Sequence, residues 1–274
     1  MKLLNNTYGK GRVRVVKILR EGDIHIVKEV AVKVMLTGDL ESSYTAADNS
    51  KVVPTDTIKN TVNIVAKDHL GEEIERYAVT LGQHFVSRYE QITSATVEVE
   101  ERRWERIGDK PHSFTAPGSP APFCRVIVDA DGFSIDSGVR NWLVMKSTGA
   151  GFEGYPACEF TTLEETQDRV VCTSIEATWR WQAIPENYNV ANFSILEAAL
   201  VPFCDNHSPS VQATLYQMGE AALNACPEIA RIHFAMPNKH CLLVNFKPFD
   251  LENANEVFTF TDEPHGQIEA TIGR

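Results

Sequence analysis

The sequence has 274 residues, of which 43% are hydrophobic and 23% are charged. This composition suits one large or two medium globular domains and excludes a disordered polymer. The formal net charge of −11 makes nucleic acid an unsuitable partner, because its phosphates would be repelled. No apolar stretch approaches the roughly 20 residues of a membrane helix, so we expect no membrane partner.

The two ends of the sequence suggest where the protein works. The N-terminus becomes polar too early for a signal peptide. The last residues, Ile272-Gly273-Arg274, differ from the Ser-Lys-Leu type of peroxisomal address. We therefore expect a cytoplasmic protein, or a peroxisomal one if the natural C-terminus is longer.

The cysteines are spaced too widely for a structural zinc site. No two form a Cys-x-x-Cys pair, and the chain is long enough to fold without disulfides. We expect six free thiols and no metal ligands among them: Cys124, Cys158, Cys172, Cys204, Cys226 and Cys241.

The first half begins with two strands and continues with two helices. Alternating apolar residues over 12–20 and 24–36, split by Glu21-Gly22-Asp23, predict a β-hairpin. Thr55-Asp56 precedes an apolar run with helical spacing and is typical of a helix N-cap. A second helix is predicted over 74–89. Strands are predicted again at 94–107 and near 122–130.

The second half repeats this order. Strands are predicted at 139–147 and 170–183, then helices at 188–204 and 209–225, then strands at 229–236, 241–246 and 255–260. The apolar residues that indicate the first of these helices are Val190, Phe193, Leu196 and Leu200. The chain is thus predicted to be α+β, with two tandem ββααββ halves, 1–132 and 133–274, and paired helices on one face of antiparallel sheets. Open sheet edges favour a homo-oligomer that closes them; the alternative is a monomer with protected edges.

One glycine motif could suggest a dinucleotide. Gly149-Ala150-Gly151-Phe152-Glu153-Gly154 matches G-x-G-x-x-G, which must open a helix after a strand. Pro156 opposes that helix start, and no βαβ unit surrounds the motif. We interpret the glycines as a flexible loop that carries ligand contacts.

Short motifs spread over nearly the whole chain resemble those of the urate oxidase family in the same order. They are Tyr8-Gly9-Lys10, Ser43-Tyr44-Thr45, Asp48-Asn49-Ser50, Thr55-Asp56-Thr57, Pro111-His112-Ser113-Phe114, Lys146-Ser147-Thr148, Asp168-Arg169, Ala177-Thr178-Trp179, Ser210-Val211-Gln212 and Pro237-Asn238-Lys239-His240. The resemblance implies the tunnelling fold (T-fold), with two ββααββ halves per chain. It also implies a homotetrameric barrel whose active sites lie between subunits.

The implied reaction is oxidation of urate by dioxygen and water to 5-hydroxyisourate and hydrogen peroxide, with no metal and no other cofactor. By resemblance, Lys10 and Thr55 form a base relay that His240 assists. A hydroxyl can take a proton only if another group removes its own, and a lysine can do so only when neutral, which burial or nearby positive charge would favour. Without the resemblance, these residues would be interpreted as a surface lysine, a helix cap and a packed histidine.

The substrate contacts follow from the same resemblance. Phe152 would stack on the purine, Arg169 would hold one edge with its guanidinium fork, and the Gln212 amide would pair with the opposite edge. Taken alone, these residues would be a loop anchor, a surface ion-pair partner and a polar residue at a helix start.

The remaining implied contacts complete the pocket. They are Thr55, the backbone N–H groups of Asp56 and Val211, the side chain of Leu163, and Asn238, which would hold dioxygen and later the attacking water. Gln167 departs from the family, in which this position is often tryptophan. Two alternatives stay open: a pterin- or purine-handling T-fold enzyme with a buried glutamate and often zinc, and a non-catalytic purine-binding protein.

Overall fold

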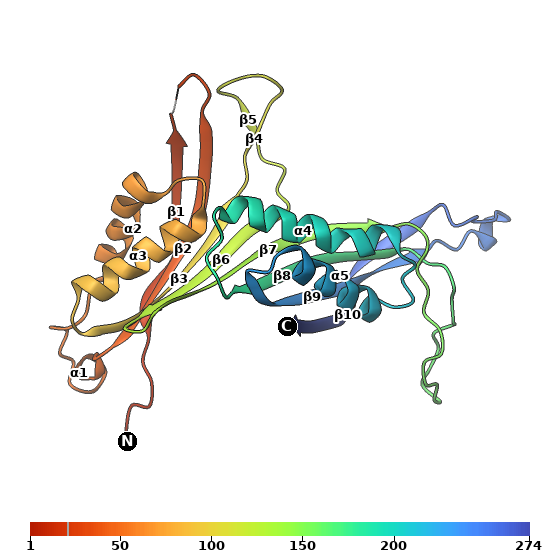
Figure 1. Ribbon diagram of the computed structural model, residues 1–274. Helices are drawn as coiled ribbons and strands as arrows, with labels where there is room; N and C mark the ends of the chain where they lie inside the picture. Colours follow the sequence, from red (N-terminus) through yellow and green to blue (C-terminus); the bar gives the residue numbers. More distant parts are fainter. Residues whose placement is uncertain (21) are drawn as a thin grey trace. The chain divides into compact units, whose positions relative to one another are not determined.

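The computed structural model describes residues 1–20 and 22–274; Glu21, in the predicted turn between the first two strands, lies outside the described residues. The chain forms two compact units. Unit 1 comprises Met1–Gly138 together with Ala183–Val190, and unit 2 comprises Val139–Gln182 together with Ala191–Arg274. In both, antiparallel strands are combined with helices, as Figure 1 shows.

The strands of unit 1 pair in the order β1-β2-β3-β6, followed by the first part of β7. Their bounds are β1 Tyr8–Leu19, β2 Ile26–Gly38, β3 Ile92–Arg102, β6 Ala121–Asp129 and β7 Gly132–Lys146. The predicted strand 94–107 is wrong at its end, because β3 stops at Arg102. The short β4, Glu105–Arg106, then pairs with β5, Phe114–Thr115.

Two long helices of unit 1 pack against its sheet: α2 (Thr55–His69) contacts β1, and α3 (Ile74–Arg88) contacts β3 and β6. A short helix, α1 (Glu41–Thr45), precedes them. Alternate residues of β2 are buried on the helix side, as period-two spacing predicts: Val30, Val32, Val34 and Leu36. The predicted N-cap is wrong by one residue, because Pro54 occupies that position with an extended backbone and Thr55 is the first helical residue.

Unit 2 repeats this arrangement. The rest of β7 is followed by β8, β9 and β10, and α5 packs against β9 and β10. The bounds are β8 Val171–Trp181, α4 Tyr188–Asp205, α5 Val211–Ala225, β9 Ile229–Leu243, the 3-10 turn η1 Lys247–Phe249 and β10 Phe258–Gly273. The first three residues of α4 belong to unit 1, and the rest of the helix belongs to unit 2. The two predicted ββααββ runs and the α+β class are therefore confirmed.

Two predictions within unit 2 are wrong in detail. The expected strands 229–236 and 241–246 form the single strand β9, because the residues after Pro237 continue the pairing: Asn238 with Thr173, and Lys239 with Cys172. Proline removes one N–H donor but does not prevent the pairing of its neighbours. The last strand, expected over 255–260, is the longer β10.

Only part of the predicted apolar face of α4 is buried, because Leu196 lies in the core but two other predicted residues do not. Val190 and Phe193 are 67% and 64% exposed, whereas Ile195 and Ala199 are fully buried. Apolar residues occur on several sides of this helix, so spacing alone could not identify the packed side.

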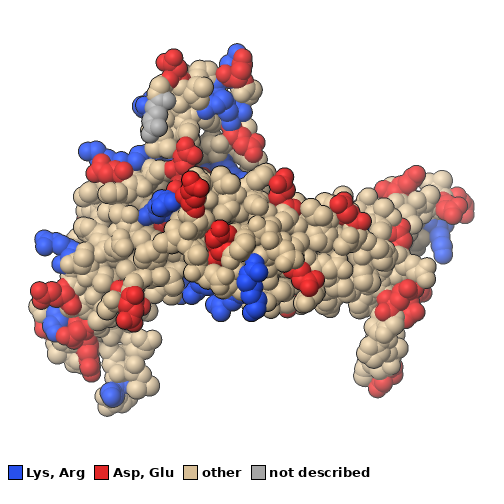
Figure 2. All heavy atoms as spheres, in the orientation of Figure 1, with Lys and Arg blue, Asp and Glu red and all other residues tan. Residues whose placement is uncertain are grey.

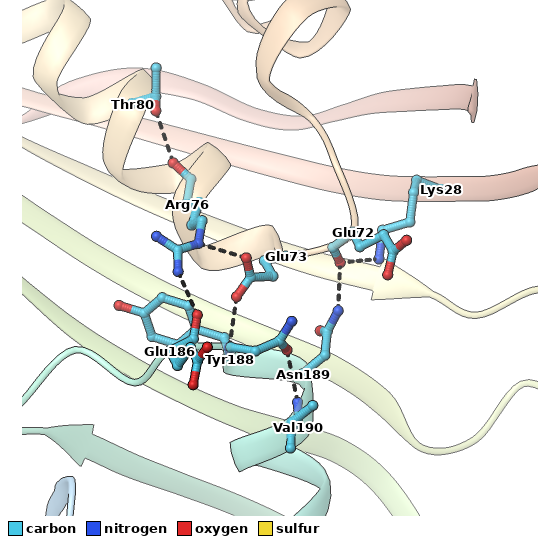
Figure 3. A network of polar contacts seen from close by, with 10 residues as sticks. Lys28, Glu72, Glu73, Arg76, Thr80, Glu186, Tyr188, Asn189 and Val190 are labelled. Carbon is cyan, nitrogen blue, oxygen red and sulfur yellow. Dashed lines mark hydrogen bonds and ion pairs between the residues drawn. The ribbon is translucent and has the colours of Figure 1, made fainter. Parts of the chain in front are cut away.

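The segment 183–190 belongs to unit 1 because its backbone is bound to the start of α3 (Figure 3). The Tyr188 N–H donates to the Glu73 carboxylate at 2.7 Å, and the Arg76 guanidinium donates to the Glu186 carbonyl at 3.0 Å. Arg76 and Glu73 are themselves paired at 2.6 Å. Glu73 and Arg76 therefore neutralise each other's charge while each also binds the backbone of the segment 183–190.

The surface carries charges of both signs. On the face shown in Figure 2, acidic side chains are interspersed with basic ones. All six cysteines are free thiols, as predicted. In the described part of the chain, no helix combines the length and the apolar character needed to span a membrane.

Candidate active site

Lys10 lies on β1 at a distortion of the sheet. It pairs with Val34 of β2, and a β-bulge follows immediately, with Arg12 at a φ of 53°. Because directly paired residues share a face, Lys10 lies on the helix side of the sheet with the buried Val34. Gly9 is required here, since a Cβ atom would stand 1.8 Å from the Val34 carbonyl oxygen.

Tyr8 connects this strand to the start of α2. Its hydroxyl donates to the Val53 carbonyl at 3.1 Å and accepts from the Val53 N–H at 2.7 Å. Val53 is buried and stands two residues before Thr55. The Tyr8 hydroxyl therefore fixes the distance between the strand that carries Lys10 and the helix that begins at Thr55.

Lys10 is also an electrostatic neighbour of the same helix end. The pKa of the exposed Asp56 carboxyl is lowered first by the hydrogen bond and charge of Lys59, then by the Asn60 amide, and to a smaller extent by the charge of Lys10. Thr55 is exposed in the first turn, where backbone N–H groups have no partner within the helix. Unit 1 thus brings together Lys10, Thr55 and the Asp56 backbone.

In unit 2, Phe152 and Arg169 form a pair. The Arg169 guanidinium carbon lies 5.3 Å from the centre of the Phe152 ring. Burial lowers the pKa of Arg169, and its Nε is buried without a hydrogen-bond partner among the described residues. A half-buried guanidinium with an unused donor beside an aromatic ring is suited to a planar anionic ligand.

Tyr155 links Phe152 to Leu163. The Tyr155 ring stacks on Phe152 with centroids 5.0 Å apart, and its hydroxyl donates to the Leu163 carbonyl at 2.7 Å. Leu163 itself is 60% exposed. The loop from 149 to 170 contains no helix, so the dinucleotide interpretation of its glycines is excluded.

Val211 and Gln212 begin α5. The Ser210 side chain caps this helix by accepting from the Ala213 N–H at 3.1 Å. The N–H groups of Val211 and Gln212 have no acceptor within the helix and are available to a ligand. Val211 is buried and Gln212 is exposed.

Asn238 and His240 lie on β9. They alternate with Lys239 and share the face of the strand that buries Phe234 and Met236. Asn238 is paired with Thr173, whose buried hydroxyl has no hydrogen-bond partner among the described residues. Both predicted residues are half-buried.

The candidate residues are therefore divided between the two units. Lys10, Thr55 and Asp56 lie in unit 1, and the others lie in unit 2: Phe152, Leu163, Arg169, Val211, Gln212, Asn238 and His240. Sequence reasoning did not assign roles to Tyr8, Tyr155 and Thr173. The hydrogen bond of Tyr8 joins it to Val53, 45 positions away, and local sequence patterns cannot predict such a contact. The only sequence signal for Tyr8 was its place in the Tyr-Gly-Lys motif.

Comparison with known proteins agrees with this arrangement. A family model described as "Uricase" matches residues 6–127 and 135–269. The uricase of Arthrobacter globiformis is 38% identical over 269 residues, covering 98% of this chain and 89% of that protein. The uricase of Aspergillus flavus is 35% identical over 287 residues, covering 97% and 95%.

Solved structures show the same fold. The crystal structure of uricase from Arthrobacter globiformis matches with a TM-score of 0.96 and 37% identity, covering 100% of this chain and 95% of that one. A urate oxidase from Bacillus sp. TB-90 matches with a TM-score of 0.87 at 23% identity, which bears on the fold alone. The chain belongs to the uricase family.

Proposed function

We propose that this protein is a urate oxidase that converts urate, dioxygen and water to 5-hydroxyisourate and hydrogen peroxide without a metal or organic cofactor. The observation that carries the proposal is the Phe152–Arg169 pair with its unused Nε donor, in a chain of the uricase family. A planar anion can stack on the ring while the guanidinium fork binds adjacent acceptors at its edge.

The opposite edge of urate would meet the start of α5. Gln212 can donate and accept at once, which suits alternating polar groups on a purine rim. The Val211 N–H adds a donor at a helix N-terminus, where negative charge is favoured. Leu163 would close one side of the pocket.

Lys10 and Thr55 would remove the proton. In this proposal the Thr55 hydroxyl takes a proton from urate while Lys10 accepts the proton of Thr55, and His240 assists the transfer. The Asp56 backbone would bind the rim beside them. Asn238 would hold dioxygen above the ring and later the water that attacks.

The reaction balances without an added oxidant. The electron-rich urate dianion transfers two electrons to dioxygen, which leaves as hydrogen peroxide after taking up two protons. Water then adds its hydroxyl to the C5 carbon of the oxidised purine and releases a proton. The deprotonated substrate is itself the electron donor, which supports a reaction without a cofactor.

We further propose that the site is assembled from two chains of a homotetramer, with unit 1 of one chain facing unit 2 of another. Exposed apolar side chains such as Phe193 and Val201, 64% and 52% exposed on α4, are typical of surfaces that a partner covers. The strand β1 ends the sheet on one side and β10 on the other, and both expose unpaired backbone groups.

Turnover by protein treated with a chelator is the first test. We expect urate-dependent dioxygen uptake, equimolar peroxide and loss of the near-ultraviolet absorbance of urate, by protein without a visible flavin or haem band. Absence of turnover at saturating urate would refute the proposal. Loss of urate turnover on chelation would instead show that the reaction needs a metal and would refute its cofactor-free part.

Substitutions separate chemistry from binding. Lys10→Met should lower kcat strongly with little change in KM, because only proton transfer is lost. Arg169→Ala should weaken urate binding by about ten-fold or more. The exposed Lys33 of β2, which pairs with Glu98 of β3 at 3.3 Å, offers a matched control. The Lys33→Met variant should retain activity. A non-catalytic purine-binding protein would show no urate turnover, and Lys10→Met would leave its urate affinity unchanged.

Mixing inactive variants tests the shared site. When Lys10→Met and Arg169→Ala chains are unfolded and refolded together, about one quarter of the sites should combine a normal Lys10 with a normal Arg169 if the two come from different chains. Activity should then reappear in the mixture. If both groups came from one chain, the mixture would stay inactive.

A further inference from the structure

A short strap, residues 148–152, carries Phe152 and is bound along one edge by Asp168. The Asp168 carboxylate accepts from the Thr148 hydroxyl, which lies 2.9 Å from each of its oxygens, and from the Gly149 N–H at 2.7 Å. These bonds, that of Thr148 first, lower the pKa of Asp168. The side chain preceding Arg169 therefore binds the strap directly.

Backbone hydrogen bonds also join the strap to the segment 166–169. The Arg169 N–H donates to the Ala150 carbonyl at 2.7 Å, and the Phe152 N–H donates to the Thr166 carbonyl at 2.7 Å. The Thr166 hydroxyl donates to the Asp168 carbonyl at 2.8 Å. Arg169 and Phe152 are thus held at fixed positions on two adjacent segments.

The other edge of the strap is bound by Ser208. Its N–H donates to the Gly149 carbonyl at 2.9 Å, and its carbonyl accepts from the Gly151 N–H at 2.8 Å. Ser208 is 5% exposed, and its hydroxyl accepts from the Thr214 hydroxyl of α5 at 2.7 Å. The same residue that binds the strap therefore binds the helix that begins at Val211 and Gln212.

Two glycines of the G-x-G-x-x-G motif make this arrangement possible. Gly149 has a φ of +74°, which disfavours other residues. At Gly151, a Cβ atom would stand 3.0 Å from the Thr166 carbonyl oxygen. The glycines of the motif therefore allow the strap to lie close to the segment 166–169.

We propose that Asp168 and Ser208 are positioning residues that hold Phe152, Arg169 and Gln212 in one geometry for urate. This inference rests on the proposed function. Three separate segments each carry one proposed substrate contact, and Asp168 and Ser208 connect the segments of Arg169 and Gln212 to the strap. Small errors in placement at such a site reduce binding of a rigid planar ligand.

The test compares two variants of the full-length protein. Asp168→Asn loses the negative charge that two donors share, and Ser208→Ala leaves the buried Thr214 hydroxyl without its acceptor. For each we expect KM for urate to rise about ten-fold, equal to about 1.4 kcal/mol, while kcat at saturation changes less than about two-fold. The inhibition constant of xanthine, a planar purine without the C8 oxygen, should rise in parallel.

Asp129 offers a matched control, because its carboxylate accepts from the Asp131 N–H at 2.9 Å in a turn of unit 1 that carries no proposed contact. Asp129→Asn should leave both KM and the xanthine constant unchanged. If Asp168→Asn and Ser208→Ala lower the melting temperature but leave both constants within two-fold of the wild type, the two residues are merely structural and the inference is wrong.

Failure of the proposed function would have a different signature. A wild-type protein without urate turnover contradicts that function directly. Calorimetric titration with urate then still tests the positioning role, because it measures wild type and variants without turnover. Equal affinity in all of them would overturn the inference, and weaker binding by the two variants would support it.

Discussion

The Tyr8 hydroxyl should control catalysis without touching urate. Tyr8→Phe removes the group that both donates to and accepts from the Val53 backbone, at 3.1 and 2.7 Å. The buried Val53 N–H and carbonyl then lack this partner, which costs about 1–3 kcal/mol of folding free energy. For a unit of this size, about 2 kcal/mol corresponds to a fall of about 4–8 °C in Tm.

The kinetic effect follows from position. Val53 precedes Thr55 by two residues, so a shift of this segment moves the Thr55 hydroxyl relative to Lys10. Displacements of about 1 Å at a reacting group can cost about 100-fold, and we expect a smaller shift to lower kcat about ten-fold. Stopped-flow measurement of urate loss over a range of urate concentrations reports both kcat and KM.

Tyr77 provides the matched control. Its buried hydroxyl donates to the Val62 carbonyl at 3.0 Å, which joins α3 to α2 far along the helix from Thr55. Tyr77→Phe should lower Tm by a similar amount and leave kcat unchanged. If Tyr8→Phe and Tyr77→Phe lower kcat equally, or if Tyr8→Phe leaves it intact, the positional argument is refuted.

Three further predictions concern single sites. Thr173→Val should leave stability unchanged or raise it by about 1 kcal/mol, because the replaced hydroxyl has no partner among the described residues; a clear fall in Tm would show that it binds something there. Gly9→Ala should cost about 2–4 kcal/mol and abolish turnover, because its Cβ would meet the Val34 carbonyl, and denaturant titration with a urate assay measures both. Hydrogen bonds depress the pKa of Asp168, so its contribution to stability should be present above the ordinary value of 3.8 and be lost as pH falls from there through the lowered pKa of the folded protein. The Tm difference between wild type and Asp168→Asn should therefore shrink in acid; a constant difference would contradict this.

Local patterns were reliable where one face of an element is buried. The alternation in β2 and the helical spacing of α3 predicted the sides that pack, because each has a single apolar face. The prediction was wrong for part of α4, where Val190 and Phe193 are exposed although Leu196 is buried, and at Pro237, where β9 continues. Both errors arise because packing against neighbouring elements decides which side is buried and whether a strand persists.

The sequence by itself determined the α+β class, the doubled ββααββ order and, through its ordered motifs, the residues proposed for the site. Only the tertiary structure decided how those residues are held. Tyr8 binds Val53 across 45 positions, and Ser208 joins the strap to α5. Hydrogen bonds between distant segments leave no periodic signal in the chain, because they depend on where the folded backbone places their partners.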